Sequence, residues 1–323
     1  MMNMNLSYPS ARRTAAMTAL APLSWGTTYA LTTEALPAGR PLLVAFVRVV
    51  PAGLVLVLVG SIRSRWWPHG VEWQRIVALG TCNFGLFFPL LFVAVYRLPG
   101  GVAAAVGGLQ PLLVAAITAA IRRELPRRTD LAVGLAAAIG VGLVVVHPGV
   151  NLDPVGVLAA VGANVSFSMG VVLTKRHPTP IDRLAATGWQ LLVGGLVLLV
   201  PMLALEGAPP ALTGRNVAGF AYLSLVATAA AYVLWFEGIR RLPAPAPPLL
   251  GLAAPLTGAT LGWVLLGQDL SLLQLLGFAL TLGSIAYGAT LGGRAGRGKA
   301  PGRVAGGGAT ALASLGATPR GSS

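Results

Sequence analysis

The sequence is poor in charged residues and in the side chains that build catalytic or metal sites. Asp, Glu, Lys and Arg make up 10% of its 323 residues, against about 25% in ordinary soluble domains. Its single cysteine, Cys82, excludes an intramolecular disulfide framework and a cysteine-based metal site. The three histidines, His69, His147 and His177, lie far apart near the ends of apolar segments. We therefore expect no metal site and no cofactor.

Acidic residues are also missing from the centres of the apolar segments. An intramembrane hydrolase needs a nucleophile with a base, or a pair of carboxylates within reach, and no glycine-rich phosphate loop is present either. An enzyme is therefore not expected. The basic residues are spread over short loops rather than gathered on one surface with aromatic residues between them, so we expect no nucleic acid partner.

What the sequence does contain is a series of apolar segments, and hydrophobic residues make up 55% of the chain. About 20 apolar residues suffice for a helix to cross a bilayer. The pattern predicts an all-α polytopic membrane protein with about ten transmembrane helices. We place the spans near 15–36, 41–61, 74–96, 100–121, 131–147, 154–174, 184–205, 216–239, 244–266 and 272–292. Only "RLPG" (97–100) separates the third and fourth spans, so one long kinked helix is the alternative there.

The positions of Lys and Arg predict the orientation of these spans. With the N-terminus in the cytoplasm, all but four of the 23 Lys and Arg residues fall in cytoplasmic segments; the exceptions are Arg40, Arg48, Arg97 and Arg215. Because cytoplasmic loops carry an excess of basic residues, we expect a multi-pass protein of the inner or plasma membrane with both termini cytoplasmic.

An internal repeat appears when each residue is compared with the residue 144 positions later. Arg97-Leu98-Pro99 then matches Arg241-Leu242-Pro243, Gly107 matches Gly251 and Pro111 matches Pro255. Five helices is an odd number, so two such copies cross the membrane in opposite senses, which is the inverted-repeat plan of many secondary transporters. We divide the chain into a cytoplasmic N-terminal segment (1–14), two five-helix repeats (15–147 and 154–292) and a disordered basic cytoplasmic tail (293–323).

Paired prolines predict an interruption near the middle of the fourth and ninth spans. Pro111 and Pro255 each lie about eleven residues into a span, near the bilayer midplane, and each frees the carbonyl of a glycine four residues earlier, Gly107 or Gly251. Backbone that is broken at this depth is tolerated where it is buried in protein or lines a wet cavity. Kinks that improve helix packing are the alternative.

Polar and aromatic residues inside the spans are the candidates for a solute site, because polar groups are costly in lipid. Thr228, Tyr232 and Trp235 share one helix face, and the residues 144 positions earlier are Phe84, Phe88 and Leu91. Such an apolar slot with a few polar tips suits a small organic solute. The candidate cavity residues are Trp25, Arg48, Asn83, Phe84, Phe88, Gln110, Asn164, Ser168, Gln190, Thr228, Tyr232 and Trp235.

Arg48 is the one charged residue well inside a span, in "VAFVRVVPAGLVLVLVG" (44–60). Two interpretations remain open from the sequence. The guanidinium either clamps backbone carbonyls or Glu34, or it lines a wet cavity and anchors an anionic group of the solute.

Three segments resemble an EamA domain of the drug/metabolite transporter superfamily. They are the Trp-Gly and single-arginine region at 23–58 and the two segments with a mid-helix proline at 97–125 and 241–271. The chain departs from the family pattern where Gly267-Gln268 and Arg123-Glu124 replace a Gly-Glu pair, which weakens a role for that acid. The resemblance implies a ten-helix carrier with a central cavity, most often exporting amino acids, related metabolites or toxic compounds.

We thus expect a secondary transporter that exports small organic metabolites by alternating access, with a small-molecule solute and the lipid bilayer as its partners. The solute, the coupling ion and the oligomeric state are not specified by the sequence. The alternative is a membrane scaffold or subunit that does not transport and binds a partner or anionic lipid through its basic loops and tail.

Overall fold

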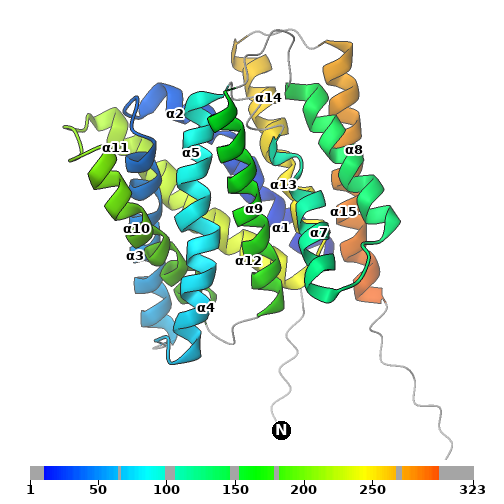
Figure 1. The fold of residues 1–323 in the computed structure, drawn as a ribbon, viewed down its shortest axis with the longest axis horizontal. Coiled ribbons are helices and arrows are strands. Elements are labelled where there is room, and N and C mark those ends of the chain that lie inside the picture. Colours follow the sequence, from blue (N-terminus) through cyan, green and yellow to red (C-terminus); the bar gives the residue numbers. More distant parts are fainter. Residues whose placement is uncertain are drawn as a thin grey trace, which may run out of the picture.

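A computed structural model describes residues 11–64, 67–98, 106–145, 153–177, 182–266 and 271–297 of the chain. Within these ranges the protein is a bundle of helices without strands. In Figure 1, α3, α10 and α11 lie on one side, α7, α8 and α15 on the other, and α1, α9 and α12 between them. The start of α1 and the end of α15 lie at the same end of the bundle, which we call the terminal end.

The described helices form the ten predicted spans. In chain order these are α1 (Ala11–Gly26) with α2 (Thr28–Ala35); α3 (Pro41–Ser64); α4 (Val71–Gly80), η1 (Thr81–Leu86) and α5 (Phe87–Arg97); α7 (Gln110–Arg122); α8 (Arg128–Val145); α9 (Pro154–Arg176); α10 (Arg183–Leu205); α11 (Gly214–Ala221), η2 (Tyr222–Ala230) and α12 (Ala231–Arg241); α13 (Ala246–Gly251) with α14 (Ala253–Leu266); and α15 (Leu272–Arg297).

Five of these helices are long and apolar enough to cross a membrane uninterrupted: 41–64, 71–97, 154–176, 183–205 and 214–241. Several of the others are broken within the bundle. The span predicted at 15–36 is divided at Thr27, and α15 continues to Arg297 instead of ending near residue 292. The chain is extended at Leu98, so the third and fourth spans are not one long helix. Residues 1–10 and 298–323, most of the predicted terminal segments, lie outside the described residues.

The most extensive helix contacts follow the symmetry of an inverted repeat. They join α3 to α10, α8 to α15, α5 to α9 and α1 to α12. In two equivalent halves, the second span corresponds to the seventh and the fifth span to the tenth. The contacts of α3 with α10 and of α8 with α15 therefore each join a span to its own counterpart. The contact of α5 with α9 joins spans three and six. Its counterpart is the contact of α12 with α1, which joins spans eight and one. The two five-helix halves are therefore related by a pseudo-two-fold axis.

Both halves also carry a π-helical segment in the same span. The segment η1 lies within the third span and η2 within the eighth, and a shift of 144 residues places Thr81–Leu86 on the second part of η2. π-Helical turns occur mostly as local bulges and are frequent at functional sites.

Small residues bring pairs of helices into close contact. A Cβ atom added to Gly277 of α15 would lie 2.6 Å from the carbonyl oxygen of Gly140 in α8, and one added to Gly140 would lie 2.9 Å from that of Gly277. Outward-facing apolar side chains complete the pattern. Leu54, Leu58 and Ile62 on one face of α3 are 56%, 62% and 73% exposed, as expected of a surface covered by lipid.

Candidate functional site

A cavity of about 140 Å³ lies between the two halves. It is lined from α1, α2, α3, α5, α9 and α12, and from the breaks that precede α7 and α14. We call it the central cavity. Nine of the residues singled out in the sequence line it: Trp25, Arg48, Phe88, Gly107, Gln110, Asn164, Tyr232, Gly251 and Pro255.

Arg48 reaches this cavity from α3 and is 3% exposed. Its Nε donates a hydrogen bond to Thr228 Oγ1 (2.8 Å), and its Nη2 donates to the carbonyl of Ala227 (3.0 Å). The guanidinium carbon lies 4.8 Å from the centre of the Phe88 ring, a cation–π distance. Arg48 therefore clamps a backbone carbonyl of η2 and also forms part of the cavity wall. The side chain of Glu34 lies outside the described residues.

Aromatic rings form much of the remaining wall. Tyr232 packs against Trp25 at 5.0 Å between ring centres and against Phe84 at 4.8 Å. Trp25 is oriented by a hydrogen bond from its Nε1 to the carbonyl of Ala227 (3.0 Å), the same carbonyl that accepts from Arg48. Because the rings fix one another, the cavity is preformed.

The two helix interruptions open onto this cavity. A turn at 108–109 precedes Pro111, which stands at the start of α7, and a turn at Leu252 precedes Pro255 in α14. An added Cβ at Gly107 would meet no atom within 4 Å, whereas one at Gly251 would lie 3.3 Å from both Gln110 Oε1 and a Trp235 ring carbon. Gly107 thus borders open space, and Gly251 allows the close packing of Gln110 and Trp235.

Seven of the singled-out residues do not line the central cavity: Asn83, Phe84, Pro111, Ser168, Gln190, Thr228 and Trp235. Thr228 and Phe84 lie behind the cavity wall. Thr228 accepts a hydrogen bond from Arg48, and Phe84 packs against the ring of Tyr232. Trp235 is fully buried between Trp25 and Phe167, so it is not an interfacial belt residue.

Asn83 and Gln190 form a separate buried pair. Asn83 Nδ2 donates to Gln190 Oε1 (3.2 Å), and Asn83 packs so closely on α9 that only a glycine fits at Gly170. Ser168 is also fully buried away from the cavity. Asn83 and Gln190 thus connect η1 to α10, a role that composition alone does not separate from cavity lining, whereas the Ser168 hydroxyl has no hydrogen-bond partner among the described residues.

Other lining residues were not among the sequence candidates. They are Thr32, Phe87, Leu91, Phe92, Val95, Phe167, Leu252 and Ala254. Most are apolar, and an apolar residue within an apolar span carries no signal that separates a cavity wall from a packing or lipid-facing position. Leu91 is the exception, since the shift of 144 residues pairs it with Trp235. The described residues contain no cluster of three or more His, Cys, Asp or Glu side chains suited to a metal ion.

A second cavity, of about 480 Å³, lies toward the terminal end. Its charged lining residues are Arg122, Glu124, Lys175 and Arg176, and the rest of the lining is Thr118, Ala244 and apolar residues of α7, α9, α12 and α13. We call it the terminal cavity. Only a thin layer separates it from the central cavity. On α7, Gln110 lines the central cavity and Val114 the terminal one; on α9, the corresponding residues are Phe167 and Val171. Four residues span about 6 Å along a helix axis.

The central cavity extends away from the terminal end. Its lining includes Thr32 and Val95, close to the ends of α2 and α5 that lie opposite the terminal end. From α9 and α12 it includes Asn164, Phe167 and Tyr232 but no described residue of their last two turns. The two cavities therefore approach the same layer of the molecule from opposite directions.

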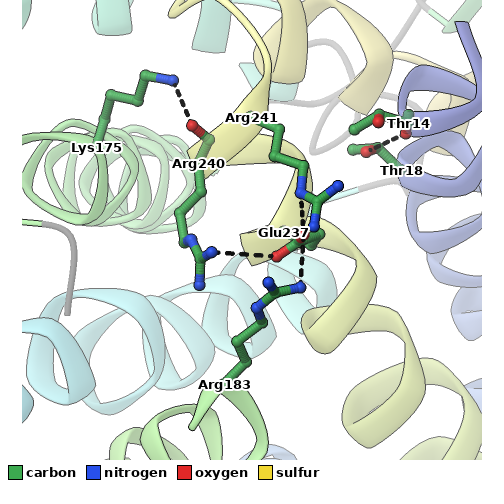
Figure 2. A network of polar contacts seen from close by, with 7 residues as sticks. All are labelled: Thr14, Thr18, Lys175, Arg183, Glu237, Arg240 and Arg241. Atoms are coloured by element: carbon green, nitrogen blue, oxygen red, sulfur yellow. Dashed lines mark hydrogen bonds and ion pairs between the residues drawn. The ribbon is translucent and has the colours of Figure 1, made fainter. Parts of the chain in front are cut away.

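Polar contacts join α9, α10 and α12 at the terminal end (Figure 2). Glu237 pairs with Arg183 (2.7 Å), with Arg240 (3.7 Å) and with Arg241. Lys175 Nζ donates to the carbonyls of Arg240 (2.9 Å) and Leu242 (2.6 Å) at the end of α12. At the opposite end, Asp153 caps α9 and pairs with Arg97 (3.2 Å). The N–H of Gly156 holds the pKa of the Asp153 carboxyl below its usual value.

The protein has ten spans in two inverted halves, paired helix breaks and a cavity between the halves. This architecture is that of membrane carriers. Two segments, 12–146 and 154–287, match the model of the EamA-like transporter family. The chain belongs to this family, as its resemblance predicted.

Known proteins agree with this assignment. The chain is 40% identical over 259 residues to the Protein PecM of Dickeya dadantii (strain 3937). The aligned region covers 80% of this chain and 86% of that protein. It is 29% identical to the Uncharacterized transporter YwfM of Bacillus subtilis (strain 168), over 81% and 89% of the two chains. A solved structure described as "Crystal structure of protein" has the same fold, with a TM-score of 0.70 and 23% identity over 87% of this chain and 99% of that one. The protein is thus a multi-pass membrane transporter.

Proposed function

We propose that this protein is a secondary carrier that exports small organic metabolites by alternating access through the central cavity. Amino acids, related compounds and toxic organic molecules are the solutes that the family implies. The observation that carries the proposal is the pair of cavities that approach one layer of the molecule from opposite ends, about one helical turn apart. When this layer rearranges, a solute site between the cavities is reached first from one side of the membrane and then from the other.

The broken helices supply the elements that can rearrange. Gly107 and Gly251 stand at interruptions in equivalent spans of the two halves and border the cavity. A helix with a break can bend there without disrupting a continuous ladder of hydrogen bonds. In the present conformation the layer between Gln110 and Val114 of α7 separates the two cavities, and the contacts of Glu237 and Lys175 hold α9, α10 and α12 together at the terminal end. A rearrangement of this layer opens the terminal cavity toward the central one, and the equivalent rearrangement in the other half closes the opposite end.

We place the terminal end, with both termini, in the cytoplasm of a cell bounded by this inner or plasma membrane. The basic residues support this orientation. Arg122, Lys175, Arg176, Arg183 and Arg240 all lie at the terminal end, and cytoplasmic ends of spans carry the excess of Lys and Arg. A solute that enters the terminal cavity from the cytoplasm and leaves through the opposite end is exported, as the family resemblance implies.

Export is tested by comparing cells that make the protein with cells that make the Gly107→Phe variant, which fills the central cavity. We expect energy-dependent loss of one or more metabolites from cells that make the wild-type protein, measured by profiling of cells and medium. A truncation after Arg297, where α15 ends, tests the scaffold alternative. A carrier keeps its export rate without the tail, whereas a tail-dependent scaffold loses its partner. Equal metabolite profiles with and without the protein would contradict export.

A further inference from the structure

We propose that the terminal cavity is an entry site that binds amphipathic organic anions, in which an apolar body carries a carboxylate or a similar anionic group. The inference rests on the proposed transport function, because it takes this cavity as the cytoplasmic entrance, and it narrows the class of solutes. The order of apolar and basic side chains along the cavity leads to it.

The terminal cavity is apolar in its interior and basic at its outer end. On α7, Val114, Thr118 and Arg122 line it at intervals of four residues, which places them on one helix face. On α9, the lining residues four apart are Val171 with Lys175 and Val172 with Arg176. Arg122 and Arg176 are the last residues of their helices. Each helix therefore places positive charge toward the terminal end and an uncharged surface one turn deeper.

The guanidinium groups of Arg122 and Arg176 are available to an anion. Neither makes a hydrogen bond or an ion pair with a described residue, and Glu124, which lines the same cavity, forms no ion pair with either. Lys175 adds a third positive charge. Its Nζ donates to the carbonyls of Arg240 and Leu242, which hold the ammonium group in place without a carboxylate (Figure 2).

Basic side chains outnumber acidic ones at this site. Three basic residues and Glu124 line the terminal cavity, and Asp130 lines a smaller adjoining cavity of about 60 Å³. A cleft that is lined mainly by one sign of charge focuses the electric field and raises the local concentration of counter-ions. An anionic group is thus favoured at the outer end, while an apolar body gains energy from burial against Val171 and Ile239.

The orientation of the protein in the membrane does not account for this arrangement. An excess of basic residues at the cytoplasmic end requires no particular side of a helix. Arg123, Arg127 and Arg128 belong to the same end and line no part of the terminal cavity. The placement of Arg122 and Arg176 around one cavity with an apolar interior is therefore a separate feature.

A cysteine in the terminal cavity reports the sign of the local potential. In the purified full-length protein, Thr118→Cys in a Cys82→Ala background is labelled with anionic sulfonatoethyl and cationic trimethylammonioethyl methanethiosulfonate. The measurement is the ratio of the anionic to the cationic labelling rate. Because field focusing changes local ion concentrations about tenfold or more, we expect Arg122→Gln combined with Arg176→Gln to lower this ratio at least about tenfold.

Arg63→Gln combined with Arg75→Gln is the matched control. These two arginines lie near the same end, on α3 and α4, and do not line the terminal cavity. The control pair should keep the ratio. A ratio that does not change in the Arg122 and Arg176 variant, or that falls as much in the control, would overturn the inference.

Three probes identify the class of ligand by protecting Thr118→Cys from methyl methanethiosulfonate, a neutral reagent. Hexanoate has both the negative charge and the apolar body, hexylamine reverses the charge, and acetate lacks the body. We expect hexanoate to slow labelling more than either of the others. Equal or stronger protection by hexylamine or acetate would overturn the inference. If the Arg122 and Arg176 variant does not fold, these probes decide on the protein that keeps both arginines.

Export measurements keep this inference separate from the transport function. An anionic preference at Thr118→Cys in a protein that moves no metabolite supports the anion site and contradicts transport. Export by a protein whose Thr118→Cys shows no anionic preference overturns the anion site and leaves transport intact.

Discussion

Arg48 lines the central cavity from within a membrane-spanning helix and is almost fully buried. Placing an arginine at the middle of a membrane helix costs about 2.5–3.5 kcal/mol on insertion scales. In this protein Thr228 and the carbonyl of Ala227 accept from it, and Phe88 presents its ring face. These contacts join α3 to η2 and place the guanidinium at the cavity wall. The clamp on a carbonyl is thus observed, whereas the binding of an anionic solute group by Arg48 stays a prediction.

Thr228→Val tests the clamp. The change keeps the shape of the side chain but removes the hydroxyl that accepts a hydrogen bond from Arg48 Nε. Both side chains are buried. A buried donor left without its partner costs about 1–3 kcal/mol, so we expect a lower melting temperature and slower transport. Thr228→Ser keeps the acceptor and is the control. Equal melting temperatures for the valine and serine variants would contradict the clamp.

The sequence predicted the polar part of the site better than its apolar part. Arg48, Gln110 and Tyr232 were found because polar atoms are costly inside a span, and all three line the cavity. Asn83 and Gln190 carry the same signal but pair with each other elsewhere. Phe87 and Phe167 were missed because a phenylalanine in a span is equally suited to lipid, to packing and to a cavity wall.

At the scale of the element, the interruptions of the helices position the site. Prolines signalled two of them, and the turns at 108–109 and Leu252 lie just before Pro111 and Pro255. The break at Thr27 and the π-helical segments η1 and η2 carry no proline and were not predicted. Whether a helix breaks or widens into a π-helical turn at such places depends on packing between helices, which no local pattern of residues reveals.

The ion pairs of Glu237 are an element-scale contact that joins α10 to α12 at the terminal end. Glu237 faces Arg183 of α10 as well as Arg240 and Arg241 of its own helix. Glu237→Gln leaves three guanidinium groups near one another without their shared partner. We expect a loss of stability larger than the about 0.2–1 kcal/mol of one exposed pair, measured as a lower melting temperature that high salt partly restores by screening the repulsion.

Asp153→Asn is the matched control for Glu237→Gln at the other end of the bundle. Arg97 and Asp153 form an ion pair whose side chains are 49% and 36% exposed. Asparagine caps a helix about as well as aspartate, so α9 keeps its cap and we expect little change. A melting temperature that falls as much for Asp153→Asn as for Glu237→Gln would show that the Glu237 cluster has no special role.

At the scale of the whole molecule, the inverted repeat accounts for two cavities that meet at one layer. The sequence predicted the repeat because matched prolines and glycines recur 144 residues apart. It did not predict how the helices pack at the terminal end. That packing depends on contacts between spans, such as those of Lys175 with the end of α12.

Alternating access predicts opposite changes in accessibility at the two cavities. Thr32→Cys reports on the central cavity and Thr118→Cys on the terminal cavity, each in a Cys82→Ala background because Cys82 is the only native cysteine. We expect an impermeant thiol reagent outside the cell to label the first variant and not the second. A transported solute should change the two labelling rates in opposite directions. Parallel changes would contradict a moving barrier.

The most direct test of the central claim is solute flux through a plugged central cavity in proteoliposomes. Gly107 and Gly142 both have room for a larger side chain, since an added Cβ meets no atom within 4 Å at either position, but only Gly107 lines the cavity. With each solute that the wild-type protein moves, we predict that Gly107→Phe abolishes flux and that Gly142→Phe retains it. Undiminished flux through folded Gly107→Phe protein would contradict transport by way of this cavity.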